Sequence, residues 1–223
     1  MKNYKQLQEG VYDKNIFHAV FLAGGPGSGK SFVARTTTGG LGMKVVNSDD
    51  AFEKLLKKAG LSLKMPASEL KPRDAVRDKA KIITDKRRDM YIDGRLGLVI
   101  DGTGREYDKI QYQASLLRGL GYQTYMIFVN TSLDVAQERN QQRARTIDPE
   151  IVTKSWNDVQ RNIGKFQNFF GGKNFIIVDN NVNDPDTKLF NHVMKRVRAL
   201  VTRKITSPQA KQWIQQQLSM KKR

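Results

Sequence analysis

The octet GGPGSGKS at residues 24–31 constrains the fold of this chain more than any other feature. It fits the pattern GxxxxGK[ST] and directly follows the apolar stretch at residues 19–23, which is predicted to be a β-strand. Glycines let backbone N–H groups wrap closely around phosphate oxygens, and the helix expected after the octet adds the positive end of its dipole. The octet therefore predicts a strand–loop–helix unit that binds a nucleoside triphosphate.

The octet also predicts roles for individual residues. Lys30 is expected to reach the outer phosphates as a point charge, and the Ser31 hydroxyl is expected to hold the Mg²⁺ ion that bridges them. ATP and Mg²⁺ are therefore the predicted cofactors. The other loop residues expected to contact ATP are Gly25, Pro26, Gly27, Ser28 and Gly29.

Length and composition exclude several other classes of protein. A chain of 223 residues, 39% of them hydrophobic, is long enough for one domain with a large core. No stretch reaches the roughly 18 to 20 apolar residues that span a bilayer, and the N-terminus lacks the apolar segment of a signal peptide, so we expect a cytoplasmic protein with no membrane partner. The absence of cysteine excludes disulfides and thiolate ligands, and we interpret His18 and His192 as structural or solvated. The oligomeric state stays open.

The formal net charge of +17 is concentrated in two segments. Residues 54–88 hold 12 basic and 4 acidic residues, and residues 195–223 hold 9 basic and no acidic residues. Solubility requires a net charge of only about 2 to 8 in a small domain. Because proteins that neutralise phosphates release condensed counterions, the excess favours a polyanionic partner. The alternative is that these charges only keep helix faces solvated.

Five short apolar runs alternate with helical patterns along the chain, which is typical of βαβ units. The runs at residues 98–100 and 175–178 are continuously apolar, so we expect strands covered on both faces, as in a parallel sheet. The predicted class is α/β, with the P-loop NTPase fold and helices on both faces of the sheet. The predicted strands are residues 18–23, 43–47, 97–101, 122–129 and 174–178.

A long basic insertion, residues 51–93, is predicted between the second and third strands. Pro66 and Pro72 predict breaks between two helices, and residues 73–91 place apolar side chains among charges, as expected of an amphipathic helix. The apolar positions of this helix are Ala75, Ala80, Ile82, Ile83 and Met90.

Further helices are predicted at residues 133–143, from Asp148 onward, and at residues 187–201. Residues 1–205 are expected to form the P-loop domain, and residues 206–223 are expected to form a basic tail. The sequence leaves open whether this tail is a short helix or a partly disordered arm.

Two carboxylates, Asp49 and Asp50, follow the second strand, at the edge where open α/β sheets bind their ligands. One of them could accept the proton of an attacking hydroxyl as the γ-phosphoryl group moves. Aspartate is also well suited to cap the helix expected near residue 51. We therefore expect Asp49 to act as the base, and Asp50 both to cap the helix and to contact the substrate.

The third strand ends in the sequence DGTGR at residues 101–105. Asp101 has the position of a Walker B residue, able to interact with Ser31 and hydrated Mg²⁺. The glycines let the chain approach a substrate closely, so Thr103 and Arg105 are expected to contact it. The letters DGTG also fit the DxxG of GTPases, but the sequence has no NKxD motif, so a GTPase is disfavoured.

Arg139 and Arg143 share one helical face at i, i+4 spacing after the fourth strand. Their guanidinium groups could clamp the phosphates and stabilise charge in the transition state. Arginines at a helix C-terminus are also ordinary partners of the helix dipole, so this signal by itself does not decide between the two roles.

Four segments, taken in order, resemble the P-loop kinases that include phage polynucleotide kinase and the zeta-toxin-like kinases. They are GGPGSGKS, NSDD, DGTGR, and ERNQQRAR followed by TIDPEIVTKSW, and the likeness covers about residues 17–178. The resemblance implies a five-stranded parallel sheet in the adenylate-kinase-like order. It also implies Asp49 as the general base, with Arg143, helped by Arg139, on the donor phosphates. The larger basic insertion and the basic tail depart from the family, which leaves the acceptor open.

The sequence supports three functional hypotheses. The first, favoured by the charge, is an ATP-dependent kinase that phosphorylates a nucleic acid, DNA rather than RNA, at a 5′ end or a hydroxymethylated base, with Arg73 and Arg77 contacting its phosphates. The second is a zeta-toxin-like kinase that acts on a small molecule such as a nucleotide sugar. The third is a non-catalytic P-loop protein that binds ATP as a structural ligand while attached to DNA.

Overall fold

The structure, a computed structural model, describes residues 9–38, 41–64, 66–142, 146–181 and 187–221. At its centre is a five-stranded sheet with the order β2-β3-β1-β4-β5, in which every neighbouring pair is parallel. This confirms the predicted α/β class and the adenylate-kinase-like order. The strands are β1 (His18–Ala23), β2 (Lys44–Val46), β3 (Leu98–Asp101), β4 (Gln123–Asn130) and β5 (Phe175–Asp179).

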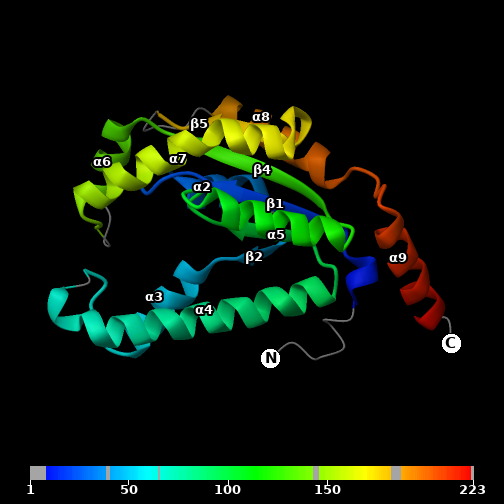
Figure 1. Ribbon diagram of the computed structural model, residues 1–223, viewed down its shortest axis with the longest axis horizontal. Coiled ribbons are helices and arrows are strands. Elements are labelled where there is room, and N and C mark those ends of the chain that lie inside the picture. The colour runs from blue at the N-terminus through cyan, green and yellow to red at the C-terminus, as the bar shows by residue number, and fades with distance from the viewer. Residues whose placement is uncertain (1–8, 39–40, 65, 143–145, 182–186, 222–223) are drawn as a thin grey trace.

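Helices cover both faces of the sheet, as predicted. Helices α5 (Tyr107–Gly119) and α7 (Pro149–Phe170) lie on one face, in front of the strands in Figure 1. Helices α2 (Lys30–Thr38) and α8 (Thr187–Val201) pack on the other face.

The remaining helices surround these two layers. The insertion forms two helices that pack against each other near the β2 edge and enclose a small core of their own. In Figure 1 its long second helix runs along the bottom of the molecule. The two insertion helices are α3 (Ser48–Lys58) and α4 (Leu70–Asp93). The other elements outside the two layers are α6 (Leu133–Gln141), α9 (Pro208–Lys221) and the 3₁₀ turns η1 (Glu9–Tyr12), η2 (Ala67–Glu69) and η3 (Gly172–Asn174).

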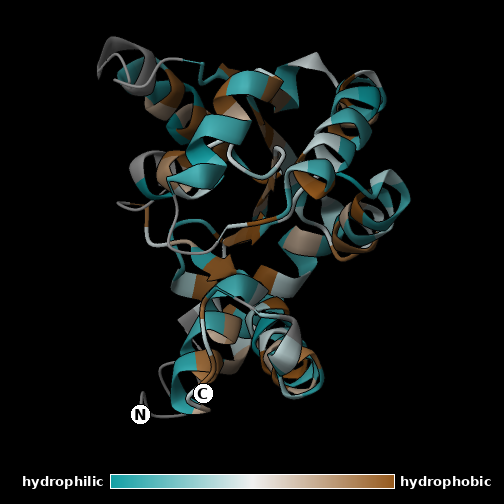
Figure 2. Cartoon of the chain, turned by 90° about the vertical axis from the view of Figure 1, so that its left-hand side faces the viewer, coloured by the Kyte–Doolittle hydropathy of each residue, from teal (hydrophilic) through white to brown (hydrophobic). Residues whose placement is uncertain are grey.

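The alternation of side chains along β1 divides the core between the two faces. Phe21 packs into the cluster under α5 and α7, whereas Val20 and Leu22 pack into the cluster under α2 and α8. Every residue of β1 is buried, which explains why its sequence is continuously apolar rather than alternating. Figure 2 shows the brown strands enclosed by helices with teal outer sides.

Each predicted strand forms, with ends within one residue of the prediction. The Asp148 side chain caps α7 by accepting a hydrogen bond of 2.8 Å from the Glu150 backbone N–H. The helix predicted at residues 187–201 has the bounds of α8. Apolar periodicity and capping residues were therefore sufficient to locate these elements.

The insertion differs from the prediction in where its helices begin. Helix α3 starts at Ser48 rather than near residue 51, because Asn47 caps it. Pro72 lies in the first turn of α4 and does not separate two helices. A proline is tolerated there because the first N–H groups of a helix have no acceptor within the helix.

Helix α4 buries a narrower stripe than the sequence predicts. Its buried residues are Val76, Ala80 and Thr84, spaced by four residues. The helix packs mainly against α3 and β2, so only this stripe is covered and the rest of the surface faces solvent. The predicted apolar positions that are exposed instead are Ala75, Ile82, Ile83 and Met90.

The C-terminal segment forms a helix, which answers the question that the sequence left open. Ala210 of α9 is fully buried against Gly121, and the Trp213 ring meets the Phe17 ring edge-on at 5.5 Å. These contacts fix α9 to the amino-terminal end of the sheet. Within the described ranges, no helix is both long and apolar enough to cross a membrane.

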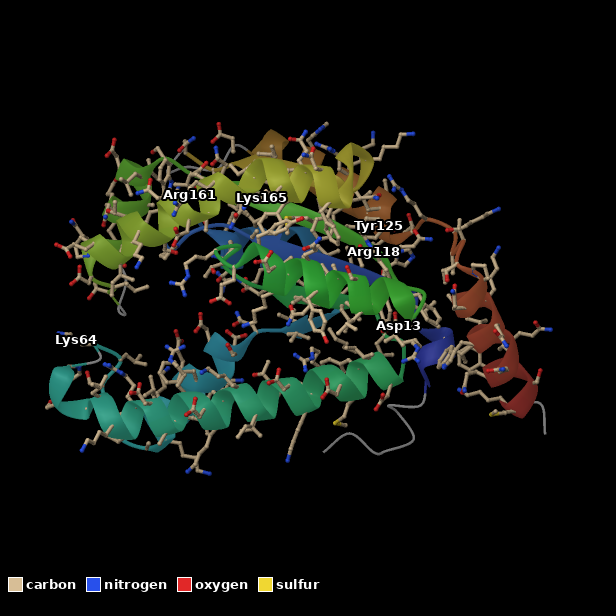
Figure 3. The ribbon with its side chains drawn as sticks, viewed as in Figure 1. Asp13, Lys64, Arg118, Tyr125, Arg161 and Lys165 are labelled. Carbon is tan, nitrogen blue, oxygen red and sulfur yellow. The ribbon has the colours of Figure 1, made fainter. Side chains whose placement is uncertain are left out.

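His18 is buried and uncharged at neutral pH. Its Nδ1 lies 3.0 Å from the hydroxyl of Tyr125, which lines a hollow together with Arg118 at the amino ends of the strands (Figure 3). The pKa of His18 is lowered to about 4, mainly by burial and to a lesser extent by the positive charge of Arg203, against an opposing hydrogen bond with the Arg203 backbone. His18 is therefore structural, as expected.

This burial makes stability depend on pH. Because the folded-state pKa of His18 lies below the unfolded value of about 6.5, the unfolded chain takes up the proton first, and stability falls as the pH drops from about 6.5 toward 4. We expect a loss of roughly 2 kcal/mol between pH 6.5 and pH 5, measured as the free energy of urea unfolding. His18→Phe should flatten this dependence, whereas His192→Gln, at an exposed position, should leave it unchanged. An unaltered profile in His18→Phe would refute the assignment.

Candidate functional site

The glycine-rich loop connects the end of β1 to the start of α2, as the octet predicts. Gly27 and Gly29 have φ angles of +78° and +82°, in the left-handed region that favours glycine. A Cβ atom on Gly27 would overlap the carbonyl oxygen of Ala136 in α6. The loop therefore needs glycine both for its backbone conformation and for the close approach of α6.

The Lys30 side chain folds back over the loop. Its Nζ donates hydrogen bonds to the carbonyl oxygens of Gly24 at 2.6 Å and Gly25 at 3.2 Å. These carbonyls hold the ammonium group at the loop without a phosphate. Negative phosphate oxygens would compete with these neutral acceptors for the same ammonium group.

Asn180, which directly follows β5, holds the glycine-rich loop in place through a side-chain hydrogen bond. Its buried side chain donates through Nδ2 to the carbonyl oxygen of Ser28 at 2.8 Å. Its own carbonyl oxygen accepts a hydrogen bond of 2.8 Å from Nη1 of Arg139. Asn180 therefore ties the glycine loop to the helix that carries Arg139.

Replacing Asn180 with alanine should loosen this anchor. The Ser28 carbonyl would lose its amide donor in a buried position, at a cost of about 1–3 kcal/mol in unfolding free energy. ATP affinity should fall as well, because the loop is no longer held. The matched control is Asn181→Ala, since the exposed Asn181 accepts from Ser132 N and does not touch the loop. Equal melting temperatures and ATP affinities for the two variants would contradict the anchoring role.

The two carboxylates after β2 lie in the first turn of α3. Asn47, not Asp50, caps this helix, because the Asn47 side chain accepts from the Asp49 backbone N–H at 2.7 Å. The prediction that Asp50 is the cap is therefore wrong. Both aspartates have exposed side chains in the first turn of the helix.

Asp101 lies at the end of β3, beside these aspartates and Lys30. Asn47 Nδ2 donates to Asp101 Oδ2 at 2.8 Å. Burial raises the pKa of Asp101, Lys30 opposes this change, and the charges of Asp49 and Asp50 add to it. Three carboxylates and the loop lysine therefore share one electrostatic neighbourhood at the carboxyl edge of the sheet.

A cleft of about 410 Å³ opens at this edge, between α4 and α5. Ser48 and Asp101 lie on its wall, as do Gly102, Thr103 and Gly104 of the segment after β3. The Thr103 carbonyl oxygen accepts from the Gly24 backbone N–H at 2.9 Å. The cleft wall is thus bonded directly to the phosphate-binding loop. Other lining residues are Lys81, Thr84, Asp85, Arg88, Glu106, Lys109 and Gln113.

Each cation that lines the cleft has a carboxylate partner. Arg88 pairs with Asp85 at 2.7 Å and with Asp89 at 3.0 Å. In the same way, Lys81 pairs with Asp78 at 3.2 Å, and Lys109 pairs with Glu106 at 3.7 Å. The lining therefore combines these charge-compensated cations and other hydrogen-bonding groups with apolar side chains such as Phe21, Ile100 and Ile110.

The comparisons with known proteins identify the family. Residues 20–165 match the model of a protein family described as an AAA domain. The chain belongs to this AAA domain family. A search of curated proteins found no match.

Solved structures share the fold of this AAA domain at low sequence identity. A candidate kinase from Chloroflexus aurantiacus has a TM-score of 0.59 and 17% identity, over 82% of this chain and 97% of that chain. A structure from the PezAT toxin–antitoxin system of Streptococcus pneumoniae has a TM-score of 0.54 and 13% identity, over 91% and 98%. Shikimate kinase from Acinetobacter baumannii has a TM-score of 0.48 and 14% identity, over 85% and 96%. The fold is that of P-loop kinases, and these comparisons do not reach the phage polynucleotide kinase type.

Several predicted site residues of the AAA domain lie away from the cleft. Arg77 stacks over the Phe52 ring at 4.1 Å, and neither Arg77 nor Arg73 lines the cleft. Arg105 pairs with Glu106 at 3.6 Å beside the cleft. Arg143 lies outside the described residues.

Arg139, in contrast, lies at the glycine loop. Its Nη1 is 3.8 Å from the position that a Cβ atom on Gly29 would take. Arg139 therefore lies next to the loop and is not one of the residues that line the cleft.

Sequence reasoning missed three asparagines that organise the site of the AAA domain. Asn47 bonds Asp101 and Asn180 bonds the loop, while Asn162 of α7 donates to the carbonyl oxygens of Gly104 at 3.0 Å and Arg105 at 2.8 Å. None of these three asparagines belongs to the GxxxxGK[ST] pattern of the octet. The positions of Asn47 and Asn180 directly after apolar strands were the signal available in the sequence.

The residues of the AAA domain fit ATP and Mg²⁺. The loop offers left-handed glycines and the Lys30 ammonium group, and the Ser31 side chain is exposed at the start of α2. No group of three histidine, cysteine, aspartate or glutamate side chains suited to a metal ion occurs among the described residues. Magnesium bound to a nucleotide needs only one or two protein ligands, because phosphates and water supply the others. Ser31 and Asp101 are the residues that would hold it.

Proposed function

We propose that this protein is an ATP-dependent phosphotransferase whose acceptor is an alcohol group of a small molecule bound between α4 and α5. The observation that carries the proposal is the cleft itself, which contains Asp101 and Thr103 in its wall and is bonded to the glycine loop through Thr103. A phosphoryl donor and an alcohol can therefore meet at one edge of the sheet.

The roles of the residues follow from this arrangement. Bound Mg²⁺–ATP supplies the γ-phosphoryl group and neutralises part of its charge. Lys30 orients the outer phosphates, and Ser31 and Asp101 hold the metal. Asp49 takes the proton of the acceptor hydroxyl as the acceptor oxygen bonds to the γ-phosphorus, and the bond to the β–γ bridging oxygen breaks to release ADP.

The lining of the cleft favours a compact acceptor with several hydroxyl groups. Carboxylates such as Asp85 and Glu106 accept hydrogen bonds from hydroxyls, and Thr103 and Gln113 offer further polar groups. The paired state of Lys81, Arg88 and Lys109 means that a polyanionic acceptor would have to break ion pairs to gain phosphate contacts. An uncharged sugar suits this lining better than a polynucleotide.

The comparisons agree with a kinase. The Chloroflexus aurantiacus structure, which is described as a candidate kinase, has the same fold over 97% of its length. The nucleic-acid acceptor remains a second candidate because of the net charge of +17. In that case, the 5′ end of a polynucleotide would have to enter the cleft while the rest of the polynucleotide lies along the insertion.

A labelling experiment separates these hypotheses. The protein is incubated with γ-labelled ATP, Mg²⁺ and, in parallel, sugars, nucleotide sugars, single-stranded oligonucleotides and hydroxymethylated duplexes. We expect label on a small polyhydroxylated molecule, and loss of label with Asp85→Asn or Gln113→Ala through a higher KM. Label on oligonucleotides only would support the nucleic-acid hypothesis. ATP binding without transfer to any acceptor would support the non-catalytic one.

A further inference from the structure

The helical layer formed by α2 and α8 contains basic residues and no acidic residue. Neither the sequence KSFVARTTT of α2 nor the sequence TKLFNHVMKRVRALV of α8 has an aspartate or a glutamate. The chain has no acidic residue at all from position 187 to its end. Since the whole chain holds 22 acidic residues, they are concentrated in other parts of the molecule.

The cations of this layer point to solvent. Val193, Val197 and Leu200 of α8 are buried against the sheet, whereas Lys195, Arg196 and Arg198 are exposed. Arg35 of α2 and Arg203, which follows α8, are also exposed. Arg203 lies over the ring of Tyr125, which packs under this layer. We call Arg35, Lys195, Arg196, Arg198 and Arg203 the basic face.

Among the described residues, no carboxylate pairs with the charges of the basic face. In the part of the chain that the structure describes, none of these five side chains forms an ion pair. Arg203 donates instead to Oδ1 of Asn174 at 2.8 Å and to the carbonyl oxygen of Lys173 at 3.2 Å, which are neutral acceptors. The cations of the cleft, in contrast, are all paired. The excess positive charge is thus available on this face and not at the acceptor site.

Like charges held on one rigid surface repel each other, and a line of phosphates relieves this repulsion while condensed counterions are released. With 15 residues, α8 is about 22 Å long, which corresponds to roughly six to seven base pairs of a duplex. A membrane surface fits less well. A helix that binds lipid inserts its apolar side, whereas the apolar side of α8 is buried in the protein core.

We propose that the basic face binds the sugar-phosphate backbone of a nucleic acid, as a site separate from the acceptor cleft. The cleft is formed with α4 and α5, and the basic face covers the opposite side of the sheet from α5. Nucleic acid and a small acceptor can therefore be bound together, and the nucleic acid positions the enzyme rather than reacting in it. This inference does not depend on the proposed phosphoryl transfer.

The test compares two variants with the same loss of charge. One is Lys195→Gln/Arg196→Gln/Arg198→Gln in the basic face. The control is Lys79→Gln/Lys86→Gln/Arg87→Gln, which removes three exposed cations from α4. Binding of a fluorescent 30-base-pair DNA duplex is followed by anisotropy between 50 and 200 mM NaCl.

We expect the native protein and the α4 control to bind alike within about threefold. The basic-face variant should bind at least tenfold more weakly, with a slope of log K against log salt that is smaller by about 2 to 3, because each lost phosphate contact lowers it by about 0.9. Equal weakening in both variants would show a net-charge effect and overturn the proposal. So would a flat salt dependence, or binding to phosphatidylserine vesicles but not to the duplex. The anisotropy measurement contains no ATP, so failure of phosphoryl transfer would leave its outcome unaffected.

Discussion

Asp49→Asn is expected to lower kcat by about 10²- to 10⁴-fold while leaving the affinity for ATP within about twofold. The amide keeps the size of the side chain but cannot accept the proton of the acceptor alcohol. Asp49 lies close enough to Asp101 to raise its pKa, and although Asp49 itself does not line the cleft, the preceding residue Ser48 and Asp101 both do. Single-turnover kinetics with labelled ATP would measure the transfer step, and titration of a fluorescent ATP analogue would measure binding.

Asp50→Asn is the matched control for this variant. Asp50 occupies the next position in the first turn of α3, is also exposed, and acts on Asp101 in the same direction. Both variants remove one favourable charge from the helix N-terminus, at a cost of about 0.3–1 kcal/mol each, so they match in stability. We expect less than a tenfold change in kcat for Asp50→Asn. If Asp49→Asn transferred phosphate at the native rate, or if Asp50→Asn lost as much as Asp49→Asn, the assignment of the base would be wrong.

Gly27→Ala is expected to have the largest effect on the nucleotide loop. The added Cβ would overlap the Ala136 carbonyl oxygen and lie 2.8 Å from the Ala136 Cα, so the loop or α6 must move. Both atoms are backbone and cannot rotate away. We expect a loss of at least about 3 kcal/mol in unfolding free energy. ATP affinity should fall at least about tenfold, since the loop would no longer match the phosphates.

Gly60→Ala is the control that measures the cost of backbone strain alone, without the steric clash expected at Gly27. Gly60 has a φ of +69°, close to the +78° of Gly27, but nothing lies within 4 Å of a Cβ atom added there. Its substitution should cost only about 1–2 kcal/mol, the price of a left-handed alanine. Urea unfolding of both variants would measure the difference. Similar losses in both would show that the packing of α6 on the loop does not constrain Gly27.

Local sequence patterns predicted the sheet and its loop because these depend on neighbouring residues. The apolar run before the octet predicted β1, and Asp148 before Pro149 predicted the start of α7. The same approach gave the wrong cap for α3, because Asn47 and Asp50 are both good capping residues and the choice between them depends on where the helix begins. The residue at which α3 begins is fixed only by the packing of α3 against α4 and by the hydrogen bond from Asn47 to Asp101.

Local sequence patterns also failed to predict which charged residues form ion pairs. A count along the chain found the two basic segments. It could not tell that Arg88 is paired with Asp85 and Asp89, whereas Lys195 and Arg196, on another face, form no ion pair with any residue that the structure describes. Ion pairing depends on which elements lie side by side. The prediction that Arg73 and Arg77 contact a substrate remains untested, and Arg77 is stacked on Phe52 in the structure.

The sequence by itself determined the α/β class, the glycine loop and the residue types that meet at the carboxyl edge of the sheet, because strand formation and phosphate-binding loops are encoded in short contiguous segments. The tertiary structure alone decided which side chains share the cleft, how Asn180 links the loop to Arg139, and which positive charges are compensated. Those relations join residues as many as 152 positions apart, as in the bond from Asn180 to Ser28. No local pattern records such distances, since they arise only when the parallel strands come together.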